Sequence, residues 1–297
     1  MVKKSPLATG IRMFNCDICS GDQAIELPFV RRYTNGQVIH ICKNCGFIYV
    51  RMRRPFHRIA EVWSKELFGK AYTSATPLML ARHTYIAEFL RQKLGLKNKT
   101  VCDIGAEEGQ FLNILKNNYQ AAVFGIEPSA NNCRLLAGQK VASFCGTLEE
   151  YLACAGNGKE FADIATMMWT LENATSPKEL VLGARELLKP GGYLLVATGS
   201  RILVPFAKPL DLYLSSNPVD AHPSRFSRNS LCNLLRICGF KPEFVNSYLN
   251  DALLMCVLAK KTKIPDNPVI NKDDYRQVKR FFQKWHQDSR FFNGFNK

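Results

Sequence analysis

The stretch Val101-Cys102-Asp103-Ile104-Gly105-Ala106-Glu107-Glu108-Gly109-Gln110-Phe111 decides the fold class of this chain. Its apolar beginning predicts a strand, and its glycines predict a tight turn into a helix. A glycine-bearing turn between a first strand and its helix lets the backbone approach a ligand, and the helix N-terminus favours anionic groups. Alone, this pattern is weakly specific.

A second motif adds specificity. Gly125-Ile126-Glu127-Pro128 ends the next predicted strand on an acidic residue. A carboxylate at that place can accept hydrogen bonds from both hydroxyls of a ribose. An NAD enzyme needs the phosphate-binding spacing G-x-G-x-x-G, which the turn after Ile104 lacks. The two motifs therefore favour a nucleoside ligand other than a dinucleotide.

Residues 98–260 alternate short apolar runs with helical patterns, which is typical of βαβ units and a parallel sheet. The expected strands are TVCDIG, AAVFGIE, VASFCG, ADIATMMW, YLLVATG, PEFVNSY and ALLMCVLAKK. The expected helices are GQFLNILKNN, SANNCRLLAGQ, LEEYLACA, SPKELVLGARELL and RNSLCNLLRICGF. KPGG is expected as a turn before YLLVATG, and a long irregular segment follows that strand. The prediction is a Rossmann-like, doubly wound α/β sheet.

The chain divides into four predicted parts. Residues 1–50 hold paired cysteines, and residues 51–97 have the pattern of a helical lid or linker. Residues 98–260 form the α/β domain. Residues 261–297 are a polar tail with a helix over DDYRQVKRFFQKWHQ, a pattern typical of a packing or oligomer element.

Four cysteines form two C-x-x-C pairs, Cys16 with Cys19 and Cys42 with Cys45, and 22 residues separate the pairs. Such pairs can bring four thiolates to the corners of one tetrahedron around zinc. Asn35-Gly36 lies between two strand patterns and is a hairpin signal. The prediction is a zinc ribbon with a structural ion, because four thiolates leave no open coordination position.

The other seven cysteines stand singly, and we expect buried thiols. No export signal precedes them, so disulfides are not expected and the chain is predicted to be cytoplasmic. No apolar run reaches the roughly 18 residues of a membrane span. The net charge of +15 favours an anionic partner, which can be a nucleic acid, a phosphorylated or nucleotide-linked substrate or a membrane surface. A solvated basic surface explains the charge equally well.

The first motif resembles D-x-G-x-G-x-G of the class I S-adenosylmethionine-dependent methyltransferases, and Glu127 resembles their second acidic motif. CKNCGFIYV, FADIATMMWTLENATSP and HPSRFSRNSLCNLLRICGF are similar to segments of a bacterial subgroup with an N-terminal zinc ribbon. That subgroup methylates sugars or related intermediates of surface-polysaccharide and deoxysugar pathways. The resemblance covers residues 14–260.

The resemblance implies S-adenosylmethionine as cofactor. Asp103 and Gly105 would hold its methionine end, and Glu127 would bind the ribose hydroxyls. Thr147 and Leu148 would lie beside the adenine. The implied contacts are Asp103, Gly105, Ala106, Gly109, Phe111, Glu127, Pro128, Thr147, Leu148, Asp163 and Met167, the last two on the far side of the pocket.

Two positions depart from the family pattern. Glu107 stands where a second glycine is expected, in a turn that often needs positive φ. A carboxylate there is unfavourable beside the carboxylate of the cofactor unless its side chain points outward. Asn173 replaces the histidine that follows Glu172, so that histidine's role cannot be transferred. Asp163 is also typical of a turn cap, and Met167 of a core residue.

Methyl transfer to a hydroxyl needs a general base, and His222 is the best placed of the five histidines. It aligns with the subgroup's histidine before F-S, and a loop histidine that caps the next helix is the alternative. Asp211, Tyr213 and Asp220 could orient it or contact a small sugar or anionic acceptor.

Four functions remain open at this point. The leading one is O-methylation of a sugar or glycan-pathway intermediate. The others are C-methylation of a nucleotide-linked deoxysugar, methylation of RNA through the ribbon and the basic surface, and a catalytically inactive binding protein that keeps the fold.

Overall fold

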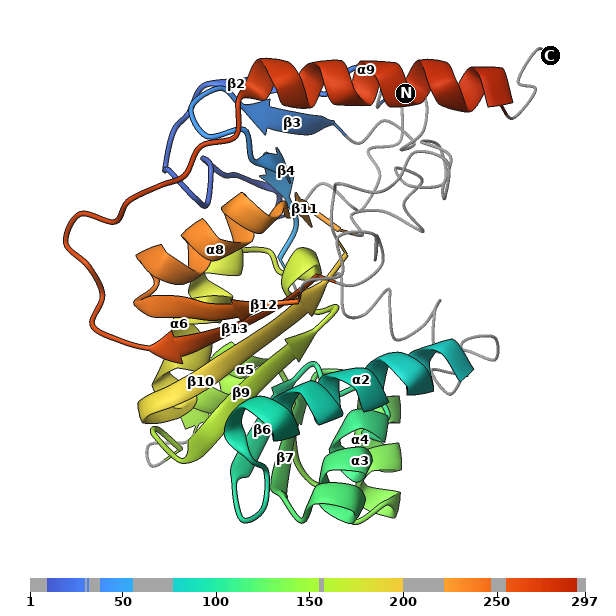
Figure 1. Cartoon of the computed structure of the whole chain (residues 1–297), viewed down its shortest axis with the longest axis vertical. Helices are drawn as coiled ribbons and strands as arrows, with labels where there is room; N and C mark the ends of the chain where they lie inside the picture. The colour runs from blue at the N-terminus through green and yellow to red at the C-terminus, as the bar shows by residue number, and fades with distance from the viewer. Residues whose placement is uncertain are drawn as a thin grey trace.

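A seven-stranded sheet forms the centre of the chain, with the strand order β12-β13-β10-β9-β6-β7-β8 (Figure 1). The computed structural model describes residues 10–29, 31, 38–55, 77–154, 158–199, 222–246 and 255–292. The strands are β6 (Thr100–Ile104), β7 (Ala122–Glu127), β8 (Ala142–Cys145), β9 (Ala162–Met168), β10 (Leu188–Thr198), β12 (Phe240–Val245) and β13 (Met255–Lys261). Strands β6 to β10 are parallel, and β13 is antiparallel to both of its neighbours. The predicted α/β fold is confirmed.

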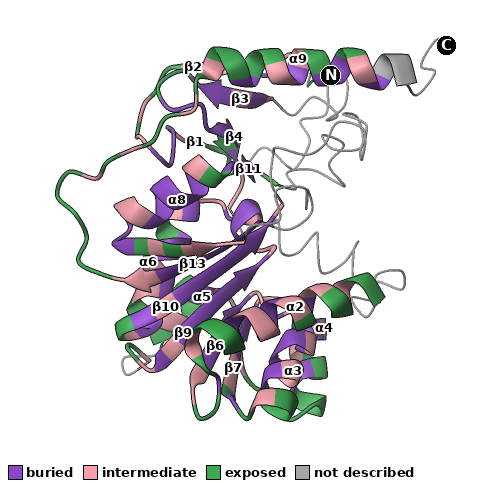
Figure 2. Cartoon of the chain, viewed as in Figure 1, coloured by how far each residue is buried: buried purple, intermediate pink, exposed green. Residues whose placement is uncertain are grey.

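Helices cover both faces of this sheet, so the central strands are mostly apolar and buried (Figure 2). One face carries α2 (Pro77–Leu94), α3 (Gln110–Tyr119) and α4 (Ala130–Gly138). The other carries α5 (Leu148–Cys154), α6 (Pro177–Leu187) and α8 (Arg228–Ile237). Among the described helices, none is long and apolar enough to cross a membrane.

Serine caps begin three of these helices. The hydroxyls of Ser129, Ser176 and Ser227 accept hydrogen bonds from backbone N–H groups in the first turns of α4, α6 and α8. At α8, the hydroxyl oxygen of Ser230 also accepts the backbone N–H of Ser227, which completes a capping box. Because each cap fixes where a helix begins, it also fixes the loops at the carboxyl ends of the strands.

The N-terminal residues form a separate small sheet above these loops. Its strand order is β11-β4-β3-β2, made from β2 (Ala24–Glu26), β3 (Ile39–Cys42), β4 (Ile48–Val50) and β11 (Ser224–Arg225). A second small pair joins β1 (Arg12–Met13) to β5 (Met52–Arg53). The expected hairpin is present as β2 and β3, while its expected turn Asn35-Gly36 lies outside the described residues. Because β11 lies within the α/β domain in sequence, between β10 and α8, the ribbon sheet includes a strand from beyond residues 1–50.

The C-terminal helix α9 (Tyr275–Phe292) lies across the ribbon sheet (Figure 1). Its residues Val278, Phe282 and Trp285 share one buried cluster with ribbon residues such as Ile41 and Ile48. The predicted tail helix is therefore present and packs on the same chain.

Three local expectations were wrong. The KPGG segment lies inside β10, where positive φ at Gly191 and a shift in register let the strand continue. Residues 52–53 form strand β5, because they pair with β1, where the predicted helical part was expected to begin; helix α2 begins at Pro77, and residues 56–76 lie outside the described residues. Cys133 of α4 and Cys145 of β8 form a disulfide, although single thiols were expected. The packing of α4 against β8 brings them together, which their separation in sequence does not indicate.

Candidate active site and metal site

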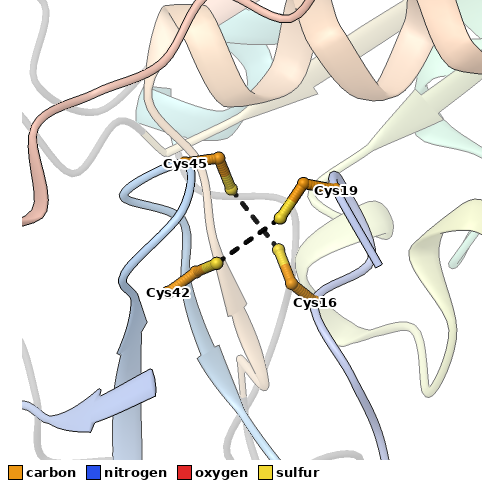
Figure 3. Close-up of side chains that lie close together, drawn as sticks. All are labelled: Cys16, Cys19, Cys42 and Cys45. Carbon is orange, nitrogen blue, oxygen red and sulfur yellow. Dashed lines mark hydrogen bonds between the residues drawn. The ribbon is translucent and has the colours of Figure 1, made fainter. Parts of the chain in front are cut away.

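The four cysteines of the two C-x-x-C pairs meet at one point, as Figure 3 shows. Their Sγ atoms lie within 4.8 Å of one another. Cys16 and Cys45 are separated by 3.4 Å between sulfurs, and Cys19 and Cys42 by 3.5 Å. Zinc–sulfur bonds of about 2.3 Å give a tetrahedron in which the sulfurs lie about 3.8 Å apart. Small movements of the four sulfurs would therefore accommodate the ion. The donor set therefore fits a structural zinc ion.

Backbone geometry holds the second cysteine pair in place. The N–H of Gly46 donates to the carbonyl of Cys42, and Gly46 has a φ of +73°. A Cβ at this position would collide with the backbone of Asp273, which in turn donates its N–H to the carbonyl of Cys45. Glycine is needed here both for the turn and for the close approach of the tail segment.

A cavity of about 680 Å³ opens at the carboxyl ends of the parallel strands. Its walls come from the ends of β6, β7 and β9 and from the starts of α5 and α6. Ligands of open α/β sheets bind at this edge. The lining residues from the predicted set are Gly105, Glu127, Pro128, Thr147 and Leu148.

Glu127 is the best-held carboxylate of this cavity. It is 5% exposed and ends β7. Its Oε2 accepts the N–H of Glu107 at 2.9 Å, and its Oε1 accepts the N–H of Ser129 at 2.8 Å. Burial raises its pKa, while these donors oppose the rise. Oε1 also accepts Nδ2 of Asn132 at 3.4 Å, so the acceptor position that remains for a hydroxyl of a ligand is on Oε2.

Asp103 and Gly105 shape the turn after β6. Asp103 is buried, and its Oδ1 accepts the hydroxyl of Thr166 at 2.6 Å. Burial raises the pKa of Asp103 to about 7, and the charge of Glu127 adds to this effect. Gly105 has a φ of +78°, and a Cβ there would collide with Thr170. A small second cavity shares Gly105 and Glu107 with the large one and is also lined by Asp103, Ala106 and Phe111. Gly109 is the N-cap residue of α3.

Glu107 adopts the positive φ that its place in the family pattern predicts, with a value of 49°. Glu107 is half-buried and lines both cavities, so it lies at the proposed ligand site. Burial, reinforced by the charges of Glu127 and Asp103, raises the pKa of Glu107 to about 8. The neutral form removes the repulsion that made a carboxylate here unfavourable.

Two predicted cofactor contacts lie away from the large cavity. Asp163 lies at the start of β9, the opposite end of that strand from the cavity. Its oxygens accept the N–H of Thr100 at 2.8 Å and pair with Lys189 Nζ at 3.0 Å. Met167 is fully buried in the core. The structure thus gives Asp163 a link between strands and Met167 a packing role.

The predicted base, His222, is exposed and has a φ of 57°. Its N–H donates to Oδ1 of Asn173 at 3.3 Å, and its carbonyl accepts from Arg225. Asn173 lines the large cavity, whereas His222 is not among the lining residues. The cap of α8 is Ser227, so the alternative of a capping histidine is not observed. Asp211, Tyr213 and Asp220 lie outside the described residues.

Several residues of the site were missed in the sequence. Arg12 and Phe14 of the N-terminal segment and Trp169 after β9 line the large cavity. His83 of α2 lines the small one, and its Nδ1 lies 3.0 Å from Gln110 Oε1. Glu172 is buried with a pKa raised by burial to about 7, and its Oε2 has no partner among the described residues. Trp169 and Glu172 stood in the quoted motif FADIATMMWTLENATSP without being singled out, and the others carry no spacing signal.

A sequence profile described as a methyltransferase domain matches residues 80–243, more than half of the chain. The chain belongs to this methyltransferase family. The match begins within α2 and ends within β12, so it contains β6 and β7 with the turn around Gly105. The prediction of a class I methyltransferase domain is confirmed.

Relatives of this methyltransferase are distant. The tRNA U34 carboxymethyltransferase of Desulfotalea psychrophila is 24% identical over 202 residues, or 64% of this chain. The chain spans 62% of that relative's length. The Burkholderia thailandensis 1,6-didemethyltoxoflavin-N1-methyltransferase, solved with S-adenosylhomocysteine, has a TM-score of 0.52 at 16% identity, covering 73% of this chain and 96% of that one. The magnesium protoporphyrin IX methyltransferase of Synechocystis PCC 6803 was also solved with S-adenosylhomocysteine. Its TM-score is 0.52 at 11% identity, and the match covers 70% of this chain and 100% of that one. These likenesses establish the fold.

Proposed function

We propose that this methyltransferase uses S-adenosylmethionine to methylate a hydroxyl of a sugar or glycan-pathway intermediate. The observation that carries the cofactor assignment is Glu127, a buried carboxylate that ends β7 in the wall of the large cavity. Two backbone N–H groups fix both of its oxygens, so its lone pairs are oriented before any ligand arrives. This is the geometry that recognition of a ribose diol requires.

The chain's own residues suggest how the cofactor would be held. Glu127 would accept the ribose hydroxyls, and Thr147 and Leu148 would lie beside the adenine. Gly105 leaves room at the turn, and Asp103 would act at the methionine end together with Glu107. The bound cofactor would supply a methyl group on a positively charged sulfur.

In the proposed reaction the acceptor oxygen forms a bond to the methyl carbon as the carbon–sulfur bond breaks. The sulfur retains the bonding pair, and the proton of the hydroxyl passes to a base. His222 is the proposed base, since Asn173 connects its backbone to the cavity wall. A change in the conformation of this segment would have to bring the imidazole to the acceptor.

The size of the cavity fits a small-molecule ligand, which in this proposal is first of all the cofactor. Small-molecule sites occupy about 300–1,000 Å³, and the cavity of about 680 Å³ falls within this range. The sugar itself rests on the resemblance of the ribbon and of the segment from His222 to the sugar-methylating subgroup. A nucleic acid is the second candidate, because the relative from Desulfotalea psychrophila is named as acting on tRNA and the net charge is +15.

Titration calorimetry with S-adenosylhomocysteine tests the cofactor assignment. We expect micromolar binding that Glu127→Ala abolishes and that Glu160→Ala, an exposed glutamate paired with Lys261, leaves unchanged. Transfer of a radiolabelled methyl group to nucleotide-linked sugars rather than to tRNA would support the sugar proposal, and the reverse result would favour the nucleic acid. Binding without transfer to any acceptor would favour an inactive binding protein. Wild-type protein that is folded, zinc-loaded and unable to bind would overturn the enzyme.

A further inference from the structure

The N-terminal segment reaches into the wall of the large cavity. Arg12 and Phe14 line it beside Thr175 and Ser176, which precede α6. Phe14 follows strand β1, and its N–H donates to the carbonyl of Arg51 at 2.8 Å. The cavity that holds Glu127 is therefore closed in part by residues from outside the methyltransferase domain.

Arg53 fixes the position of Phe14. Its guanidinium carbon lies 4.7 Å from the centre of the Phe14 ring. Arg53 is only 2% exposed, and each of its three guanidinium nitrogens donates a hydrogen bond. Nη2 donates to Asp17 Oδ2 at 2.6 Å, Nη1 to the carbonyl of Thr175 at 2.7 Å, and Nε to the carbonyl of Val50 at 2.6 Å. One side chain thus connects the Phe14 ring with the cavity wall at Thr175.

The same network leads to the metal site. Asp17 lies between Cys16 and Cys19 in the first C-x-x-C pair, and it is buried. The turn that carries two of the four sulfurs therefore also orients the carboxylate that pairs with Arg53. Any ordering of this turn by a zinc ion would be transmitted through Asp17 and Arg53 to Phe14.

We propose that Phe14 is a ligand-binding residue of the large cavity and that Asp17 and Arg53 position it. The ligand that its surroundings favour is the purine ring of the cofactor, so the inference rests on the proposed function. Phe14, Pro128, Leu148 and Leu180 provide apolar lining that suits a flat heteroaromatic ring, and Glu127 in the same cavity suits the attached ribose. The cysteine ribbon is then part of the binding site as well as a folding unit.

Calorimetry with S-adenosylhomocysteine tests the role of Phe14. Stacking of a base on an aromatic side chain predicts that Phe14→Ala weakens binding about tenfold or more and that Phe14→Trp preserves it. Met13→Ala is the matched control, because Met13 is the preceding residue, is 67% exposed and does not line the cavity. Equal affinities of wild type, Phe14→Ala and Met13→Ala would overturn the inference.

A double-mutant cycle tests the positioning role. If Asp17 acts through Phe14, Asp17→Asn weakens binding in the wild type but not further in the Phe14→Ala background. Additive losses, in variants whose zinc content and circular dichroism match the wild type, would show that Asp17 acts by another route and would overturn its positioning role. Failure of the wild type itself to bind would overturn the proposed function, and this inference with it; binding that is insensitive to Phe14 overturns this inference alone.

Discussion

The backbone N–H of Glu107 donates to Oε2 of Glu127 at 2.9 Å, so the turn after β6 is tied to the acidic end of β7. Two sequence motifs whose bonded residues lie 20 positions apart are thereby joined by a hydrogen bond. The bond uses the backbone of Glu107 and leaves its side chain in the cavity, close enough to Glu127 and Asp103 for their charges to raise its pKa. Residue 107 departs from the family pattern, yet its backbone supports Glu127, the carboxylate proposed to bind the ribose.

The side chain of Glu107 should make stability depend on pH. Burial and neighbouring charges raise its pKa from 4.5 to about 8, so the folded state favours the protonated form. The associated stability is fully present below the unfolded pKa and is lost as the pH rises towards 8. We expect the unfolding free energy of the wild type to fall by about 1–3 kcal/mol more than that of Glu107→Gln between pH 5 and pH 8.5, after allowing for partial exposure. Urea denaturation at both pH values measures this, and Glu108→Gln should behave like the wild type.

Gly105 should tolerate no side chain. It has a φ of +78°, and an added Cβ would collide with Thr170. We expect Gly105→Ala to lower the unfolding free energy by about 1–3 kcal/mol and to weaken binding of S-adenosylhomocysteine. Gly138→Ala is the matched control, because an added Cβ meets nothing within 4 Å there. Equal stabilities of the two variants would mean that the turn can move away from Thr170.

The fold and the two main motifs were predictable because local chemistry decides them. The apolar strands that alternate with helices predict a parallel sheet, and Glu127 follows its strand directly. The two cysteines of each C-x-x-C pair likewise lie only three positions apart in sequence. In each case the residues that act together are close along the chain, or their spacing is itself the signal.

Contacts between distant segments were not predictable. Phe14 lines the cavity and packs against Arg53, and strand β11 joins the ribbon sheet from within the α/β domain. No periodicity links such segments. Asp163 was misplaced for another reason: the resemblance implied a pocket residue, but its position at the start of β9 puts it at the other end of the strand, beside Lys189.

The cysteine site should hold one zinc ion per chain, since four thiolates complete one tetrahedral shell. We expect Cys42→Ser to lower zinc content and to destabilise the ribbon, because metal binding supplies folding free energy to such modules. Cys154→Ser is the control, as Cys154 is an exposed thiol outside the cluster. Atomic absorption on both variants decides the matter: full zinc content in Cys42→Ser would show that the four sulfurs do not share one ion.

Trp285 should hold the tail helix on the ribbon. The side chain is fully buried and stacks on Phe282 with ring centres 5.8 Å apart, in the cluster that includes Ile41 and Ile48. Truncation to alanine removes this apolar contact and leaves a cavity, so we expect Trp285→Ala to cost about 3–5 kcal/mol of the ribbon's stability. The segment before α9 also contacts Cys45 through Asp273, so a loosened tail should release zinc to a chelator faster. Lys279→Ala, an exposed position of the same helix, is the control. If Trp285→Ala releases zinc no faster than Lys279→Ala, the tail helix covers the ribbon without stabilising its metal site.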